Sequence, residues 1–373
     1  MSVVQRLQDD LGEVGLTLRK ASPRGADHMV LELGAEDGSI SAGQWFASAD
    51  EADRVCTLVN ARYEGRATVL PGNRHLLVQA DGADRKLTGL HRVVTRPGAT
   101  LVAHRAERRA VVRVSEASYV KVVRPGATEA IVAPLRTVGP ADVRTASVTH
   151  VDDSRGLVAL AAVAGQTLHE RISDPTVTDS ELALDLKRVG VAMRSLHSLP
   201  VRTALPAHGA LREVGAARRW LQAATTHALI PAADWQRLYA SALAQLSAAP
   251  DESALVHRDL HDKQLVLDGD APVGLLDLDL ATRGHPAVDL ANLLVHLELR
   301  VLQGLCTPER AADAAAALLE GYAPGPETRG SISAYAASTR LRLAGVYAFR
   351  PATSGLVAHL LNSVTDNRQD VLR

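Results

Sequence analysis

VHRDLHDKQLVLDGDAPVGLLDLDLATRGHPAVDL (Val256–Leu290) is the stretch that decides how the rest of the chain is interpreted. Its short apolar runs are interrupted by histidines and carboxylates. A carboxylate within a buried strand is costly unless it is paired or bound to a cation. Alternation of side chains along a strand would point Asp277 and Asp279 to the same side, where a divalent cation would relieve their repulsion.

The spacing of the polar residues in this stretch is typical of phosphoryl transfer. Asp259 is followed five residues later by the amide of Gln264, and Asp277 follows thirteen residues after that. In phosphoryl transfer, one carboxylate orients the attacking hydroxyl and accepts its proton, while an amide and a second carboxylate hold Mg²⁺ on the nucleotide phosphates. The spacing therefore predicts a magnesium-dependent, nucleotide-using site.

HRDLHDKQLV followed by LLDLDLATRGHPAVDLANLL resembles the catalytic and metal-binding segments of the aminoglycoside phosphotransferase family. That family shares the protein-kinase-like fold, and the motif here is most similar to its maltokinase-like and glucosamine-kinase-like members. The resemblance implies that Asp259 is the catalytic base and Asp277 the principal Mg²⁺ ligand. Gln264, in place of the family's usual Asn, would be a further ligand. Asp279 is either another metal contact or a hydrogen-bonded neighbour.

The same resemblance implies supporting roles for other residues of the stretch. His257 would pack beneath the catalytic loop, and Asp289 would brace the backbone of that loop. His261 and Asp262 follow the base, so they either touch substrate or lie in a solvated turn. Beyond the stretch, His296, Glu298 and Arg300 are expected to form an ordinary helix face.

Two segments nearer the N-terminus agree with a kinase-like nucleotide site. VAGQTLHE (163–170) resembles the family's hinge, where backbone groups of Val163 and Ala164 would meet adenine. Lys121 lies in the middle of the apolar strand YVKVVR, and a buried lysine needs a carboxylate or phosphate partner. Kinases place such a lysine on the α- and β-phosphates with a helix glutamate behind it, and Glu129 is the candidate glutamate.

The predicted secondary structure changes twice along the chain. Residues 1–88 are predicted to form a small α+β cap subdomain, with a first helix through Val14 and two hairpins that turn at Glu36-Asp37-Gly38 and Pro71-Gly72-Asn73. Residues 89–164 are rich in strands, with one helix that Thr128 could cap. Residues 165–373 are helical around the loop-and-strand block. This order, with the resemblance, predicts the class α+β: a bilobal protein-kinase-like fold with an N-terminal cap subdomain.

Composition excludes several other functions. The 373 residues carry a net charge of -1, and aromatic residues make up only 3%, so neither a nucleic-acid-binding field nor a base-stacking surface is expected. No apolar run reaches the roughly 18 residues that a membrane span needs. The two cysteines cannot form a disulfide framework, and a cytoplasmic location is the default expectation.

These observations predict an ATP- and Mg²⁺-dependent enzyme that phosphorylates a hydroxyl of a small polar molecule: a sugar, an amino sugar or an aminoglycoside-like compound. One alternative is a pseudokinase-like module that binds nucleotide without catalysis. The other is a metal-dependent hydrolase that uses His257, Asp259 and His261 as ligands. The identity of the acceptor and the oligomeric state are left open.

Overall fold

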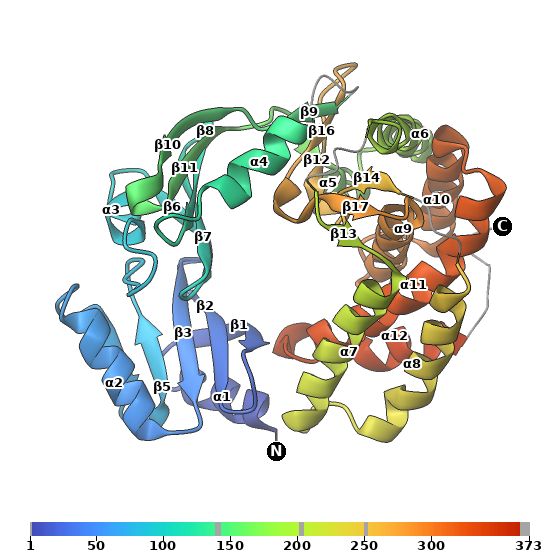
Figure 1. The fold of residues 1–373 in the computed structure, drawn as a ribbon. Coiled ribbons are helices and arrows are strands. Elements are labelled where there is room, and N and C mark those ends of the chain that lie inside the picture. Colours follow the sequence, from blue (N-terminus) through green and yellow to red (C-terminus); the bar gives the residue numbers. More distant parts are fainter. Residues whose placement is uncertain (1, 139–142, 201–204, 250–252, 366–373) are drawn as a thin grey trace.

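The computed structural model of the protein describes residues 2–138, 143–200, 205–249 and 253–365. Figure 1 shows three parts that follow one another around a ring: an N-terminal sheet in blue, a second sheet in cyan and green, and a helical part that runs from yellow-green to red. Antiparallel sheets thus precede a helical C-terminal part, which confirms the predicted α+β class. The predicted domain boundaries are not tested by this arrangement.

The first part is a five-stranded antiparallel sheet in the order β1-β2-β3-β5-β4, accompanied by two helices. Both predicted hairpins are present, but the first helix ends before Val14, which is 49% exposed. Strand β1 was not predicted, because its mixture of polar and apolar residues has no clear alternation. The elements are α1 (Val3–Gly12), β1 (Leu16–Pro23), β2 (His28–Ala35), β3 (Ile40–Phe46), α2 (Ala49–Asn60), β4 (Ala67–Leu70) and β5 (Asn73–Gln79).

The second part is another five-stranded antiparallel sheet, in the order β10-β11-β8-β7-β6. The predicted helix is present as α4, but Thr128 does not cap it through its side chain. The Thr128 hydroxyl instead donates to Asp153 Oδ1 at 2.6 Å. The elements are α3 (Leu90–Val94), β6 (Thr100–Arg105), β7 (Arg109–Ser115), β8 (Ser118–Val123), α4 (Glu129–Thr137), β10 (Val148–Asp152), η1 (Asp153–Arg155) and β11 (Leu157–Ala161).

The third part is built on eight helices among the described residues, as the helical periodicity predicts. Helix α9 is buried on nearly all sides, so it forms the centre of this part. The helices are α5 (Leu168–Ser173), α6 (Asp179–His197), α7 (Ala210–Thr226), α8 (Ala232–Ser247), α9 (Ala287–Leu302), α10 (Pro308–Tyr322), α11 (Pro326–Tyr347) and α12 (Leu356–Thr365). Residues 366–373, which the sequence places after these helices, lie outside the described part.

The block that the sequence singles out contributes strands to two small sheets. One has the strand order β12-β15-β16-β9 and the other has the order β13-β17-β14. Short 3-10 turns connect or follow these strands. The elements are β9 (Val143–Thr145), β12 (Gln166–Thr167), β13 (Ala207–His208), β14 (Ala254–Val256), η2 (Asp262–Gln264), β15 (Leu265–Leu267), β16 (Val273–Leu275), η3 (Leu278–Leu280), β17 (Thr282–Gly284) and η4 (Pro351–Thr353).

The N-terminal sheet also contacts the helical part, which closes the ring seen in Figure 1. The Ala21 amide on the edge strand β1 donates to the Phe349 carbonyl at 2.8 Å. A nitrogen of His227 lies 3.1 Å from the Gly25 carbonyl oxygen, and the Trp45 ring meets His227 edge-on at 6.1 Å. These contacts hold the N-terminal sheet against the helical part. Among the described helices, none has the length and apolar character that crossing a membrane requires.

Candidate active site

Asp289 holds the loop that presents Asp259. Its buried carboxylate, in the first turn of α9, accepts hydrogen bonds from the backbone amides of His257 and Arg258, each at 2.6 Å. It also lies 3.1 Å from a ring nitrogen of His197 on α6. Arg258 has a φ of +72°, a left-handed conformation that is unfavourable for a side chain of this kind. The bracing predicted for Asp289 is therefore confirmed, and it stabilises a strained backbone.

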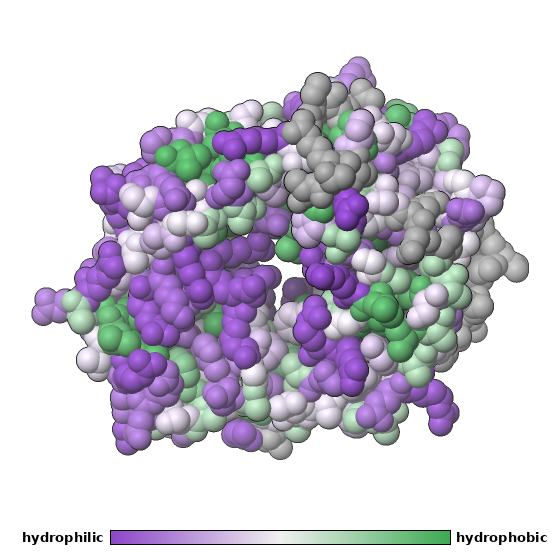
Figure 2. Space-filling model, in the orientation of Figure 1, coloured by the Kyte–Doolittle hydropathy of each residue, from purple (hydrophilic) through white to green (hydrophobic). Residues whose placement is uncertain are grey.

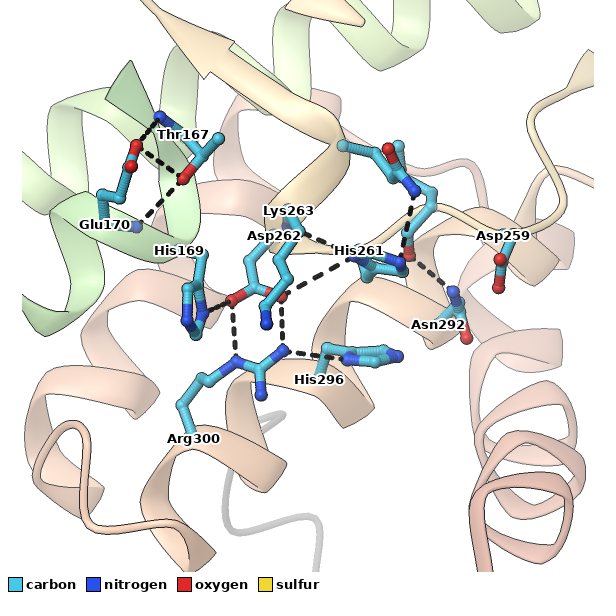
Figure 3. Close-up of polar contacts among 12 residues, drawn as sticks. Thr167, His169, Glu170, Asp259, His261, Asp262, Lys263, Asn292, His296 and Arg300 are labelled. Atoms are coloured by element: carbon cyan, nitrogen blue, oxygen red, sulfur yellow. Dashed lines mark hydrogen bonds and ion pairs between the residues drawn. The ribbon is translucent and has the colours of Figure 1, made fainter. Parts of the chain in front are cut away.

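Asp259 itself is open to solvent on one side. Its side chain is 38% exposed, and one of its oxygens lies 3.7 Å from Nη1 of Arg342 on α11. The following residue is also fixed, because the Asn292 amide donates to the Leu260 carbonyl at 2.6 Å (Figure 3). The carboxylate is thus held by its backbone while its oxygens remain accessible to a reactant.

Lys121 joins the second sheet to the helical part through two carboxylates. From β8, its ammonium donates to Asp277 Oδ1 at 2.8 Å and to Asp279 Oδ1 at 2.5 Å. Arg109 on β7 donates to Asp279 Oδ2 at 3.0 Å. Burial opposes ionisation, yet the charges of Lys121 and Arg109 hold the pKa of Asp277 below its ordinary value. Burial, with the repulsion of Asp277, raises the pKa of Asp279.

Asp277 and Asp279 meet at Lys121 for a reason other than the one predicted. Strand β16 ends at Leu275, and Asp277 has a φ of +53°. Asp279 then lies within the 3-10 turn η3. The prediction that strand alternation would align the two carboxylates is therefore wrong, because a left-handed turn brings them together.

Glu129 does not support Lys121 in this structure, which corrects the predicted pair. The Glu129 side chain is 70% exposed, and its carboxylate lies 3.2 Å from Arg136, which follows on the same face of α4 about two turns later. Glu129 is the first residue of α4, where a side chain can turn toward solvent. Asp277 and Asp279 already neutralise the Lys121 ammonium, so Lys121 has carboxylate partners without Glu129.

A cavity of about 890 Å³ brings most of the predicted nucleotide-site residues together. Its wall includes Lys121 and the metal-ligand candidates Gln264, Asp277 and Asp279, and it also includes the hinge residues Val163 and Ala164. Asp259 and Glu129 are not in this wall. Gly165 allows the hinge to approach β15, because a Cβ at this position would lie 2.2 Å from the Leu267 carbonyl oxygen.

Asp262 is buried, which the sequence analysis did not predict. Arg300 donates to both of its oxygens at 2.7 Å, and a ring nitrogen of His169 lies 2.7 Å from it (Figure 3). Burial disfavours its charged form, but hydrogen bonds from His169 and Arg300 hold the pKa of Asp262 well below its ordinary value. Arg300 is thus part of a buried ion pair and not of an ordinary helix face.

The rings of His261 and His296 lie 4.9 Å apart beside this ion pair. Burial lowers the pKa of His261, and it lowers that of His296 well below the usual value. His261 therefore does not lie in a solvated turn. A run of polar letters is the only signal that the sequence offers here, and it does not distinguish a solvated turn from a buried network.

The arrangement of His257 and His261 does not favour the hydrolase alternative. In the part of the chain that the structure describes, no group of three or more His, Cys, Asp or Glu side chains is placed to hold a metal ion. One ring nitrogen of His257 lies 2.7 Å from the Leu276 carbonyl oxygen, and the other lies 3.3 Å from the Asp259 amide. His257 therefore serves the loop beneath Asp259, as predicted.

Comparison with known proteins identifies the class to which this fold and site belong. The sequence model described as the phosphotransferase enzyme family matches residues 99–331. This is more than half of the chain, and the chain belongs to that family. It is therefore a phosphotransferase that acts on a hydroxyl group. Among curated proteins, none matches the sequence.

Solved structures with a similar fold include kinases of small molecules. A choline/ethanolamine kinase family protein from Mesorhizobium loti is 16% identical, with a TM-score of 0.50 over 76% of this chain and 93% of that one. A GDP complex of an aminoglycoside 2′-phosphotransferase-IIIa mutant is 14% identical, with a TM-score of 0.50 over 77% of this chain and 96% of that one. At these identities the likeness concerns the fold, and it agrees with the predicted protein-kinase-like architecture.

Proposed function

We propose that this protein transfers the γ-phosphoryl group of ATP to a hydroxyl of a small polar molecule of the sugar class. Amino sugars and aminoglycoside-like compounds are the other acceptors that the sequence suggests. One observation carries the proposal: Lys121 from one lobe meets Asp277 and Asp279 from the other inside the cavity that the hinge borders. The GDP complex of the similar structure supports the use of a nucleotide.

The nucleotide would lie in the cavity between the hinge and the two cations. Backbone groups of Val163 and Ala164 would meet the adenine at the hinge end. Lys121 and Arg109 would neutralise the phosphates, and both already bind anionic groups there. Glu129 has no part in this arrangement.

The residues around Asp277 fit a magnesium ion. Carboxylate oxygens of Asp277 and Asp279 and the amide of Gln264 face one cavity, and oxygen donors are the ligands that Mg²⁺ takes. Two cations now lie against these carboxylates, so the site is built to be neutralised by positive charge. When bound, the metal would offset negative charge on the phosphates.

Asp259 would orient the acceptor hydroxyl and accept its proton. Asp289 and His257 hold the loop, so the carboxylate enters the reaction without reorganising. Because the transition state of phosphoryl transfer is loose, positioning and charge neutralisation would supply most of the rate. The cytoplasmic location, the boundaries 1–88, 89–164 and 165–373, and the kinship with maltokinase-like members stay predictions.

Replacing Asp259 tests this proposal directly. Asp259→Asn keeps the shape of the side chain but removes the base, so we expect nucleotide affinity to stay within about threefold while turnover falls by about 10²-fold or more. Calorimetry with ATP and a coupled ADP-release assay measure the two quantities. Unchanged turnover would remove the base assignment. Nucleotide binding by the wild-type protein without transfer to any acceptor would favour the pseudokinase alternative.

A further inference from the structure

The end of the cavity toward the N-terminal sheet is basic. Lys20 on β1 and Arg105 on β6 both line it. Lys20 is paired with Glu32 at 2.9 Å, but the half-buried side chain of Arg105 has no hydrogen bond or ion pair with any residue that the structure describes. Burial and the charge of Arg109 lower the pKa of Arg105, and the charge of Asp259 opposes them. Arg105 therefore lies where the nucleotide cavity approaches the catalytic carboxylate.

Two more arginines flank Asp259 from the helical part. Nη1 of Arg342 lies 3.7 Å from an Asp259 oxygen, and the half-buried Arg258 immediately precedes Asp259. Arg342 comes from α11, which contributes no described residue to the wall of the nucleotide cavity. Its guanidinium therefore approaches Asp259 from an element that does not line the nucleotide cavity. Figure 2 shows hydrophilic residues on both sides of the hollow at the middle of the molecule.

A second carboxylate near these arginines, that of Glu213, already has a histidine partner. Glu213 on α7 is buried, and an oxygen of its carboxylate lies 2.7 Å from a ring nitrogen of His208. Its other oxygen lies 4.0 Å from Arg342. Among the described residues, the Arg258 side chain has no hydrogen bond or ion pair, although its backbone amide is held by Asp289. The Arg258 guanidinium is only half-buried, and the charges of Glu213 and Asp259 act on it without a hydrogen bond, so its donors are available to an anionic ligand.

We propose that Arg258 and Arg342 form an anion-binding subsite, so that the acceptor is a hydroxyl compound that also carries a carboxylate or phosphate group. This inference rests on the proposed function and narrows its acceptor class. Guanidinium groups match the planar geometry of both anions, which favours Arg over other cations at such a site. A polycationic acceptor such as an aminoglycoside would meet like charges beside Asp259.

The transfer itself balances without a further reactant. The acceptor oxygen forms a bond to the γ-phosphorus of ATP, and the bond from that phosphorus to the bridging β,γ-oxygen breaks. ADP leaves with the electron pair of the broken bond, and Asp259 takes the hydroxyl proton. The anionic group of the acceptor does not react, because its role is to place the hydroxyl at Asp259.

A set of acceptors with one skeleton and different charges tests the subsite. Glucuronate and glucose 6-phosphate supply the two anions, glucose is neutral, and glucosamine is cationic. With the full-length protein and Mg²⁺-ADP, we expect calorimetry to show at least tenfold tighter binding of one anionic probe than of glucose, and glucosamine to bind most weakly. The better anionic probe distinguishes a carboxylate site from a phosphate site. Equal binding of all four probes, or preference for glucose or glucosamine, would overturn the inference.

Variants of Arg258 distinguish a role in binding the anion from a role in holding the protein's structure. Arg258→Gln should weaken binding of the preferred anion at least tenfold while binding of glucose changes less than twofold, and Arg258→Lys should restore part of the preference. As a control, Arg237→Gln removes the same charge from an exposed position on α8, and it should change neither the binding of the anion nor the binding of glucose. Equal loss for charged and neutral probes would mean a structural role and would refute the subsite. Anion binding without ATP turnover would refute the proposed function but keep the subsite.

Discussion

Asp289→Asn offers the sharpest test of how the catalytic loop is held. The substitution keeps the size of the side chain but replaces one acceptor oxygen with an amide group that donates. In the native protein both oxygens accept backbone hydrogen bonds, from His257 and from Arg258, at 2.6 Å each. The asparagine can accept from only one side, so one buried N–H must face another donor.

The expected loss follows from these contacts. A hydrogen bond to a charged acceptor contributes about 1.5–3 kcal/mol, and a buried donor left without a partner costs about 1–3 kcal/mol. Because the two figures describe one loss seen from its two partners, we expect the free energy of unfolding to fall by about 2–3 kcal/mol. Arg258 is also released from its left-handed conformation, which shifts the neighbouring Asp259. Because a displacement of about 1 Å can cost about 10²-fold in rate, kcat should fall by about that factor.

Urea denaturation and a coupled ADP-release assay measure the two effects. Nucleotide affinity is the internal control, since Asp289 is not part of the cavity wall and ATP binding should change less than threefold. Asp313→Asn removes the same charge from an exposed site on α10 and should alter neither stability nor rate. If Asp289→Asn matched the wild type in both stability and kcat, the bracing argument would be refuted.

Three other substitutions probe the remaining charged groups. Lys121→Met leaves the two cavity carboxylates without their shared cation, so the KM for ATP should rise at least about tenfold in the coupled assay, and an unchanged KM would contradict the assignment. Arg300→Met leaves the buried Asp262 without its arginine and with only His169 as a partner, which should lower the free energy of unfolding by about 3–5 kcal/mol, and Arg300→Met with Asp262→Leu should recover part of it in urea denaturation. Burial lowers the pKa of His296, so the folded protein keeps this ring neutral where the unfolded chain binds a proton. The free energy of unfolding is therefore unaffected by this histidine above about pH 6.5 and falls below that pH, by up to about 1.4 kcal/mol per pH unit. Measured between pH 7.5 and 5.5, this fall in stability should be shallower in His296→Gln.

Local sequence signals were sufficient for most elements of the fold. Glu36-Asp37-Gly38 marks a hairpin because a glycine with positive φ closes the turn between two β-rich runs. Capping residues such as Thr178 precede helical periodicity in the same way. Strand β1 escaped prediction because its stability comes from pairing with β2 and from its contact with Phe349, and neither partner is adjacent in the sequence.

The amino-acid sequence alone determined the chemical inventory of this protein: a carboxylate, an amide and two further carboxylates at spacings that suit phosphoryl transfer. It also determined the loop that Asp289 braces. Only the tertiary structure decided how the charges are paired. Lys121 meets Asp277 across 156 positions of the chain, and Arg300 meets Asp262 across 38. Local patterns encode backbone conformation, but the partner of a buried charge depends on which distant elements pack against it.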